Sequence, residues 1–400
     1  MTTTAAPSGT VTYRDVFAVR EWRALWLAQV VSIAGDQFAA IALAVLVYGR
    51  TGSPLLAAAV FAATSAAQVV SGLLICWVAD AYPRRAVMIA CDLACAGLVL
   101  VMLIPGLPDW GLIALLFAVA LALEPFLSAR MATNATVLGP DRFQQGQAVT
   151  IATYQVAQFA GFALGGLVTA TAGVRTALAV DAASFAVSAL LVRTGVKARP
   201  APEESAGRPE ILAGTRIMLS GRAPRILLGL MCLVGFFAAP LGVIVPLGAA
   251  SGGASRTGLL LGAMFAGGTI GPLAYTRLIA TRRRERGIAV VATAACAVLI
   301  LFAFSPPLGA AAVILVLAGM CTGYIPVAGA ILFRVLPEQH HGKAGGVLGA
   351  GMALSQGVLI LVAGAVAQHV SPAVVIAWCG VAGTVCGALL AIAWRRVRYA

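Results

Sequence analysis

The chain has 400 residues, of which 61% are hydrophobic and only 10% are charged, and its formal net charge is +13. This composition excludes a water-soluble globular protein of that size, because too few polar residues are present to cover its surface. The positive charge does not indicate a nucleic-acid partner. The basic residues lie in short segments between long apolar runs, where membrane topology and anionic lipid headgroups account for them.

Twelve apolar runs fill the chain. Crossing the hydrocarbon core of a bilayer takes roughly 20 apolar residues in a helix, so these runs predict an all-α membrane protein with twelve transmembrane helices. The expected spans are residues 24–48, 55–79, 86–104, 110–129, 146–171, 175–192, 225–249, 257–280, 287–305, 308–333, 345–367 and 372–394.

The basic residues fall on one side of these spans. When the intervening segments are numbered alternately, all but three of the 27 Lys and Arg residues belong to one set, and the exceptions are Arg50, Arg175 and Arg256. Positively charged loops of inner-membrane proteins stay in the cytoplasm, so both termini are expected there. The high content of Ala, Gly and Arg is typical of a GC-rich bacterium, and the first span is expected to be retained because the polar N-terminal segment lacks a signal-peptide core.

The chain divides into two similar parts. Residues 1–194 and 225–400 are expected to form two six-helix bundles, joined by a cytoplasmic linker at 195–224. Two features recur at equivalent places in the halves, as a duplicated chain predicts. They are the basic pairs Arg20/Arg23 and Arg222/Arg225, and the segments Pro140-Asp141-Arg142 and Pro337-Glu338-Gln339.

Within the linker, apolar residues such as Ile211 and Ile217 alternate with polar ones. This pattern predicts an amphipathic helix on the cytoplasmic surface, leading into the seventh span.

Four acidic residues lie inside expected spans. An ionisable group near the bilayer centre costs about 2.5–3.5 kcal/mol, so it tends to face a cavity and to mark function. Asp36 in the first span and Glu124 in the fourth are therefore candidates for proton coupling or for binding a cationic substrate. A structural acid paired with a neighbour such as Gln37 is the alternative for Asp36. Asp92 and Asp181 lie nearer span ends, where water or a loop partner is in reach, and structural roles are expected for them.

The segment CWVADAYPRRAVMIACD joins the second and third spans. Asp80, a proline turn, and Arg84 and Arg85 would form a charged latch that holds a cytoplasmic gate closed, with Asp92 nearby. The alternative is an ordinary turn whose arginines only set the topology.

This segment resembles the loop 2–3 signature of the major facilitator superfamily, Gly-x-x-x-Asp-Arg-x-Gly-Arg-Arg. Asp80, Arg84 and Arg85 stand at matching positions, whereas Cys76, Ala81 and Pro83 replace its first Gly, first basic residue and second Gly. Two further stretches, IAGDQFAAIALAVLVYGRTGSP and VDAASFAVSALLV, are similar to the macrolide-efflux and siderophore-export branch of that superfamily. The resemblance implies two six-helix bundles around a central cavity, and export of a lipophilic small molecule in exchange for protons.

The fifth span contains a glycine motif, Gly161-Phe162-Ala163-Leu164-Gly165-Gly166. It resembles the superfamily's antiporter motif, Gly-Pro-x-x-Gly-Gly, with Phe162 in place of Pro, and this likeness implies an exporter. Close packing of small residues between helices explains Gly161, Gly165 and Gly166 equally well.

Gln37, Phe38, Phe159 and Tyr324 are candidates for lining a lipophilic cavity, with helix packing or lipid contact as the alternative for the aromatic residues. The chain contains no Walker loop, nucleophile elbow or zinc-binding pattern, and its eight cysteines form no CxxC pair. We therefore expect neither an enzyme nor an ATP-driven pump, no metal and no cofactor, and a proton gradient as the driving force. The expected partners are a lipophilic small molecule and membrane lipids, and the expected state is a monomer.

Two other functions stay open. An importer of a nutrient or organic ion would have the same fold, but it usually needs more polar or basic groups in its core, and no arginine is expected near mid-membrane. A non-transporting membrane scaffold or sensor is the other alternative, against which the duplicated halves and the intramembrane acids argue.

Overall fold

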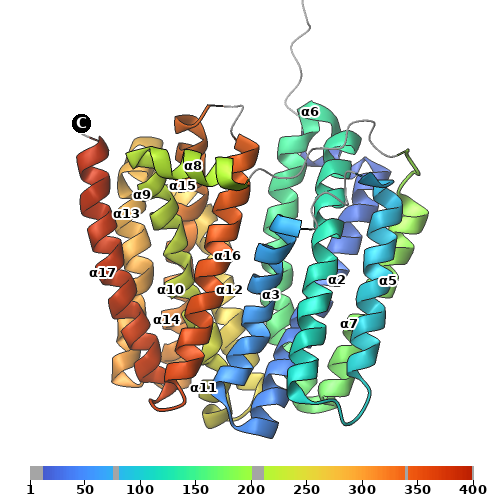
Figure 1. Cartoon of the computed structure of the whole chain (residues 1–400), viewed down its shortest axis with the longest axis horizontal. Helices are drawn as coiled ribbons and strands as arrows, with labels where there is room; N and C mark the ends of the chain where they lie inside the picture. The colour runs from blue at the N-terminus through green and yellow to red at the C-terminus, as the bar shows by residue number, and fades with distance from the viewer. Residues whose placement is uncertain (1–11, 75–80, 201–210, 338–340, 399–400) are drawn as a thin grey trace, which may run out of the picture.

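The computed structural model describes residues 12–74, 81–200, 211–337 and 341–398 (Figure 1). Within these residues the regular structure consists of helices alone, and no β-strand is present. The first half of the chain forms α1 (Tyr13–Phe17), α2 (Arg20–Thr51), α3 (Pro54–Leu74), α5 (Arg84–Met102), α6 (Asp109–Ala172) and α7 (Val174–Gly195).

The second half begins after the linker helix α8 (Ile211–Ser220), and several of its spans contain short 3₁₀ segments (η). Its elements are α9 (Arg222–Cys232), α10 (Val234–Ala238), η1 (Ala239–Gly242), α11 (Ile244–Ser251), α12 (Ala254–Leu278), α13 (Thr281–Ala297), η2 (Val298–Phe304), α14 (Leu308–Met320), η3 (Cys321–Gly323), α15 (Tyr324–Val335), α16 (His341–Val366) and α17 (Pro372–Arg398). The seventh span is interrupted around Pro240, because proline has no N–H to donate to the helix.

Eleven helical segments in the described part of the chain are long and apolar enough to cross a membrane. One of them, α6, has 64 residues, and a straight helix of that length would measure roughly 95 Å against a hydrocarbon core of about 30 Å. Its backbone breaks at Gly139, where φ is 67° and ψ is 173°. The chain reverses there, as the turn of α6 in Figure 1 shows, so α6 supplies two spans and the predicted total of twelve agrees with the fold.

The break in α6 corrects one predicted loop. The spans 110–129 and 146–171 were expected to be joined by a cytoplasmic loop, but α6 is helical from Asp109 to Leu138 and again from Pro140. Only glycine readily adopts the backbone angles of Gly139, and proline fits the first position of the helix that follows. Arg130 therefore lies within a helix, more than two turns before the reversal.

The two ends of the bundle differ in what they carry. We call the end with α8, the start of α2 and the end of α17 the linker end; it lies at the top of Figure 1. The opposite end carries the α2–α3 turn at Gly52 and the α6–α7 turn at Gly173. Helix α8 lies against α16 at the linker end, so the linker helix predicted from the sequence is present.

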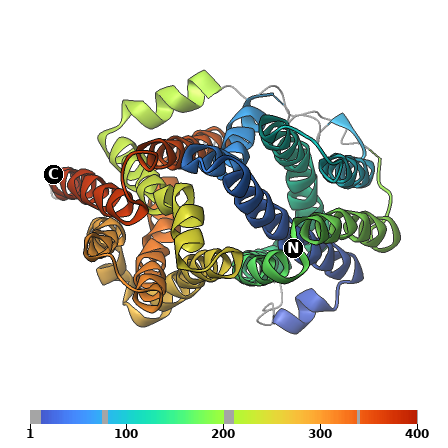
Figure 2. The same cartoon turned by 90° about the horizontal axis from the view of Figure 1, so that it is seen from below.

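The helices of the two halves form two neighbouring groups, as the view along their axes in Figure 2 shows. They pack against each other through α3 with α16 and through α6 with α12. The division into 1–194, 195–224 and 225–400 stays a prediction of the sequence.

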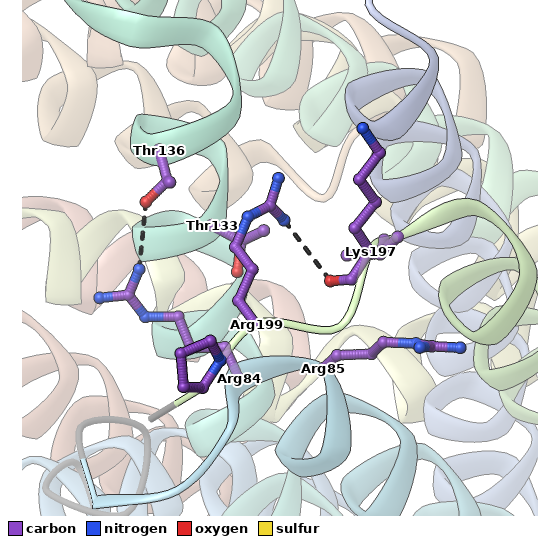
Figure 3. Close-up of a pocket in the computed structure, with 8 residues that line it drawn as sticks. Arg84, Arg85, Thr133, Thr136, Lys197 and Arg199 are labelled. Atoms are coloured by element: carbon purple, nitrogen blue, oxygen red, sulfur yellow. Dashed lines mark hydrogen bonds between the residues drawn. The ribbon is translucent and has the colours of Figure 1, made fainter. Parts of the chain in front are cut away.

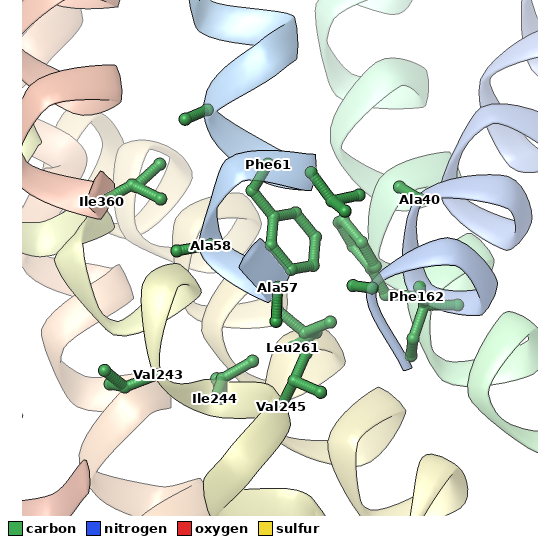
Figure 4. Close-up of a cluster of buried hydrophobic side chains, with 14 of the residues drawn as sticks. Ala40, Ala57, Ala58, Phe61, Phe162, Val243, Ile244, Val245, Leu261 and Ile360 are labelled. Carbon is green, nitrogen blue, oxygen red and sulfur yellow. The ribbon is translucent and has the colours of Figure 1, made fainter. Parts of the chain in front are cut away.

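Apolar side chains close the gap between the halves near the opposite end (Figure 4). Phe61 of α3 and Phe162 of α6 belong to the same buried cluster as Val245 of α11 and Leu261 of α12. The ring of Phe162 also stacks on Phe265 of α12, with 4.9 Å between centroids. Burying these apolar side chains together stabilises the contact between the halves.

Two closer contacts reinforce this closure. A β-carbon on Gly166 would lie 2.7 Å from both the Ala254 carbonyl oxygen and the Gly258 Cα, so the α6 and α12 backbones approach more closely than any other residue would allow. At the very end of the bundle, the Gln368 amide donates a hydrogen bond to the Ser53 hydroxyl at 3.3 Å. The opposite end is therefore closed in this conformation.

Candidate functional site

A cavity of about 410 Å³ lies between the halves. Its walls come from α2, α3, α6 and α7 in the first half, and from η1, α12 and α16 in the second. This volume is within the usual range for small-molecule sites in proteins.

The residues that face the cavity recur at helical spacing. On α2 they include Gln29, Ser32, Asp36 and Gln37, and on α3 Phe61, Thr64, Ser65 and Gln68. Positions separated by three, four or seven residues share one face of a helix. Each span therefore faces the cavity with a single stripe that contains both polar and apolar side chains. The cavity is therefore amphipathic.

Three carboxyl groups from three different spans line this cavity, namely those of Asp36, Glu124 and Asp181. Asp181 is only 1% exposed. A β-carbon on Gly35 would lie 2.7 Å from Asp181 Oδ1, so the missing side chain lets the Asp181 carboxyl reach the α2 backbone beside Asp36. The Ser184 hydroxyl donates to the Asp181 carbonyl at 2.8 Å and lies 3.5 Å from Oδ1.

The second half contributes no ionisable side chain among the lining residues that the structure describes. It supplies Leu241, Phe265, Gln356 and Ile360. All acid–base chemistry of this lining therefore belongs to the first half, while the second half offers apolar surface and one amide.

Arg130 also lines the cavity, although it was expected in a cytoplasmic loop. Its guanidinium carbon lies 5.9 Å from the centre of the ring of Phe126, which lines the same cavity. Its position was mistaken for a loop because the fourth span was expected to end at residue 129. The spacing from Leu116 through Leu123 and Leu127 to Arg130 matches one helix face and would have located it.

The structure also corrects the surroundings expected for two acids. Asp181 was expected near a water-accessible span end, but it is buried at the cavity. Asp92 is fully buried in α5, and neither of its carboxylate oxygens has a hydrogen-bond partner within the described residues. Both acids are therefore enclosed by neighbouring helices and are not exposed at a span end.

Of the four predicted lining residues, Gln37 faces the cavity, whereas the three aromatic ones do not belong to its lining. Phe38 packs against Gly165, and Phe159 is 40% exposed and lies close to Gly262 of α12. Tyr324 is 1% exposed and its hydroxyl donates to the Leu230 carbonyl at 2.9 Å, so it braces α15 against α9.

The glycine motif of the fifth span packs two helices onto α6. A β-carbon on Gly161 would lie 2.8 Å from Gln37 Cβ, and one on Gly165 would lie 3.0 Å from the Phe38 Cα, so both glycines face α2. Gly166 faces α12 instead. Close packing thus accounts for all three glycines, and their link to export stays a prediction.

The two arginines of the predicted latch form hydrogen bonds with other residues of the first half (Figure 3). Arg84 donates to the Ala132 carbonyl at 3.3 Å and to the Thr136 hydroxyl at 3.2 Å, and Arg85 donates to the Arg193 carbonyl. They tie the start of α5 to α6 and to the end of α7. Asp80 lies outside the described residues, so its part in a latch stays a prediction.

Comparisons with known proteins identify the class of this fold. The family model of the Major Facilitator Superfamily matches residues 25–320 and 230–400. No curated protein matches the chain in sequence.

Several solved transporters have the same architecture. A POT family transporter in complex with a thioalcohol-conjugated peptide superposes with a TM-score of 0.77 at 9% identity, covering 94% of this chain and 96% of that one. The nucleoside transporter NupG gives 0.72 at 13% identity, over 93% and 99% of the two chains. The peptide transporter POT in complex with sulfate also gives 0.72 at 13% identity, over 97% and 99%. At these identities the structural likeness establishes the fold. The family model matches most of the chain, so the chain belongs to the Major Facilitator Superfamily of transporters.

Proposed function

We propose that this transporter exports a lipophilic or amphipathic small molecule across the bacterial cytoplasmic membrane in exchange for protons. The observation that carries the proposal is the cavity between the halves, in which Asp36, Glu124 and Asp181 lie among apolar and aromatic walls. Alternating rocking of the two halves would expose this site to one side at a time.

The two kinds of wall suit an amphipathic cation. The three carboxylates attract a positively charged group, with one positive residue, Arg130, in the same lining. Phe61, Phe162 and Phe265 offer apolar surface for the rest of the molecule. A cation and protons would compete for the same carboxylates, so binding of one releases the other, and this competition is the basis of antiport.

The proposed orientation in the membrane rests on the charge distribution along the chain. The linker end carries nearly all of the basic residues, so we propose that it faces the cytoplasm, with both termini on that side. The likeness of the stretches around Asp36 and Asp181 to the macrolide-efflux and siderophore-export branch supports export.

Uptake of a polar molecule is the second candidate. One reason against it was the expected scarcity of polar and basic groups in the core. Arg130 and five glutamine side chains line the cavity, so that reason no longer holds. The similar solved structures include a POT family transporter with a bound peptide conjugate and a nucleoside transporter, so a polar cargo is compatible with this fold.

Flux into proteoliposomes separates these functions. The purified chain is reconstituted, and accumulation of ethidium, erythromycin, dialanine and uridine is measured with the lumen either acidic or alkaline relative to the outside. An acidic lumen drives antiport inward, so we expect ethidium or erythromycin to accumulate under that gradient alone, above the level in protein-free liposomes. Accumulation of dialanine or uridine only with an alkaline lumen would replace the proposal with proton-coupled uptake.

The role of Asp36 is tested in the same assay. Asp36→Asn keeps the shape of the side chain but removes the proton-binding group, and we expect it to abolish gradient-driven flux while the protein still folds. Asp109→Asn is the control, because Asp109 pairs with Arg50 at 3.3 Å outside the cavity lining. Full activity of the Asp36 variant would remove Asp36 as the coupling group.

A further inference from the structure

A second concave site lies on the outside of the second half, at the linker end between α9 and α17, which are neighbours in Figure 1. This α9–α17 groove has a volume of about 470 Å³. It is lined by Arg222, Arg225, Ile226, Leu389, Ile392, Ala393, Arg396 and Val397. We propose that the groove binds an anionic phospholipid.

Three arginines of the groove lack a partner among the described residues. Arg222, Arg225 and Arg396 are all exposed, and none makes a side-chain hydrogen bond or an ion pair with any residue that the structure describes. Their charges are therefore available to an anion from outside the chain.

The other basic pocket of this transporter shows the contrast (Figure 3). Arg84, Arg85, Lys197 and Arg199 line it together with Thr133 and Thr136. There Arg84 and Arg85 donate to backbone carbonyls, and Arg199 forms a bidentate pair with Glu21 at 2.8 and 3.0 Å. The cations of that pocket are thus paired with groups of the protein, whereas those of the groove have no such partner among the described residues.

The position of two of these arginines adds a second argument. Arg222 and Arg225 lie in the first turn of α9, which contains no acidic residue. The N-terminus of a helix carries a partial positive charge, so cations there are unfavourable and an anion is favourable. A bound phosphodiester would offset both the helix dipole and the arginines.

The apolar residues that α17 contributes to the groove favour a lipid over a soluble anion. On α17, Leu389 is 63% exposed and Ile392 is 52% exposed, and both continue the groove from Arg396 along the helix toward the membrane interior. Basic pockets between transmembrane helices at headgroup level are where anionic phospholipids bind. The arginines would hold the headgroup, and the wall would hold the first part of an acyl chain.

Native mass spectrometry of the purified chain tests this. The probes are dioleoyl phosphatidylglycerol, which is anionic, and dioleoyl phosphatidylcholine, which has the same acyl chains and no net charge. We expect tighter binding of phosphatidylglycerol, and the variant R222Q/R225Q/R396Q should weaken that binding by about tenfold or more, since each basic residue near the headgroups contributes.

A matched control changes the same amount of charge elsewhere. R20Q/R283Q/R286Q removes three exposed arginines of the linker end that lie outside the groove, and it should alter phosphatidylglycerol binding less than about twofold if the site is local. The single variant Arg396→Gln gives the same comparison with the least disturbance of folding. L389S/I392S keeps the charges but removes the wall, and it should also weaken phosphatidylglycerol binding.

Three outcomes would overturn the proposal. Equal loss in both triple variants would mean diffuse attraction to the basic surface. Equal binding of the two lipids would mean that the arginines do not select an anion. Displacement of phosphatidylglycerol by an equal concentration of inorganic phosphate, with no effect of L389S/I392S, would mean a site for free anions.

Discussion

At the scale of single residues, the most consequential contact is the one that brings Asp181 beside Asp36. The two acids come from spans one and six, and they share a cavity because Gly35 leaves room for the Asp181 carboxyl. Neither residue type indicates that the two side chains lie close together, because this proximity depends on how α2 and α7 pack.

Asp181→Asn should therefore impair coupling as Asp36→Asn does. The amide cannot take up or release a proton, but its oxygen can still face the Ser184 hydroxyl, so we expect a folded protein whose gradient-driven flux falls to the passive leak. Substrate-induced proton release from the purified protein in weak buffer should fall as well. Asp141→Asn, an exposed acid at the linker end, is the control. Undiminished proton release from the Asp181 variant would confine coupling to the other acids.

Residue types predicted part of this site. Asp36, Glu124 and Gln37 were identified because an ionisable or amide group in an apolar run is costly and conspicuous. Phe38, Phe159 and Tyr324 were placed at the cavity only by their aromatic character, which helix packing satisfies equally well. The type of a side chain indicates which surroundings it prefers. Which residues actually surround it depends on how the helices pack.

At the scale of elements, the reversal within α6 determines which residues can reach the cavity. Because the helix continues past the expected end of span four, Arg130 joins the same face as Glu124 and Leu127. The reversal itself depends on Gly139, whose backbone angles only glycine readily adopts.

Gly139→Ala should destabilise the protein by about 1–3 kcal/mol, the usual cost of holding a non-glycine residue in such a conformation. No neighbouring atom lies within 4 Å of the added β-carbon, so the effect would come from the backbone alone. Thermal unfolding in detergent measures it. Gly97→Ala is the control, because that site is also open but lies within α5, where alanine stabilises a helix by about 0.5–1 kcal/mol. Equal melting temperatures for the two variants would mean that the reversal tolerates a side chain.

At the scale of the whole molecule, the structure has one end closed, as one of the two conformations of the proposed alternating-access cycle would. The opposite end is closed by the Phe61–Phe162–Phe265 contacts, by the approach of Gly166 to α12 and by the Ser53–Gln368 hydrogen bond. The Phe162–Phe265 stacking, the approach of Gly166 to α12 and the Ser53–Gln368 hydrogen bond join the first half to the second, so these contacts have to separate for the halves to rock as proposed.

A cross-link across the closed end should therefore stop transport. In a chain whose native cysteines are replaced, S53C/Q368C treated with a short bifunctional maleimide is expected to lose flux, because the halves can no longer part. R50C/D109C is the matched control, since Arg50 and Asp109 pair within the first half and a link there leaves rocking free. Continued flux through fully linked S53C/Q368C protein would contradict the rocking model.

The sequence by itself determined the membrane class, the twelve spans and the uneven distribution of charge, because hydropathy and charge are properties of contiguous segments. It also pointed to two of the three carboxyl groups of the cavity. Only the tertiary structure decided that Asp181 and Arg130 reach the same cavity and that Arg84 and Arg85 form hydrogen bonds within one half. It also showed that three arginines of the α9–α17 groove have no partner among residues 12–74, 81–200, 211–337 and 341–398. Those outcomes depend on contacts between helices that are distant along the chain, and such contacts are set by how whole helix faces pack rather than by any local pattern.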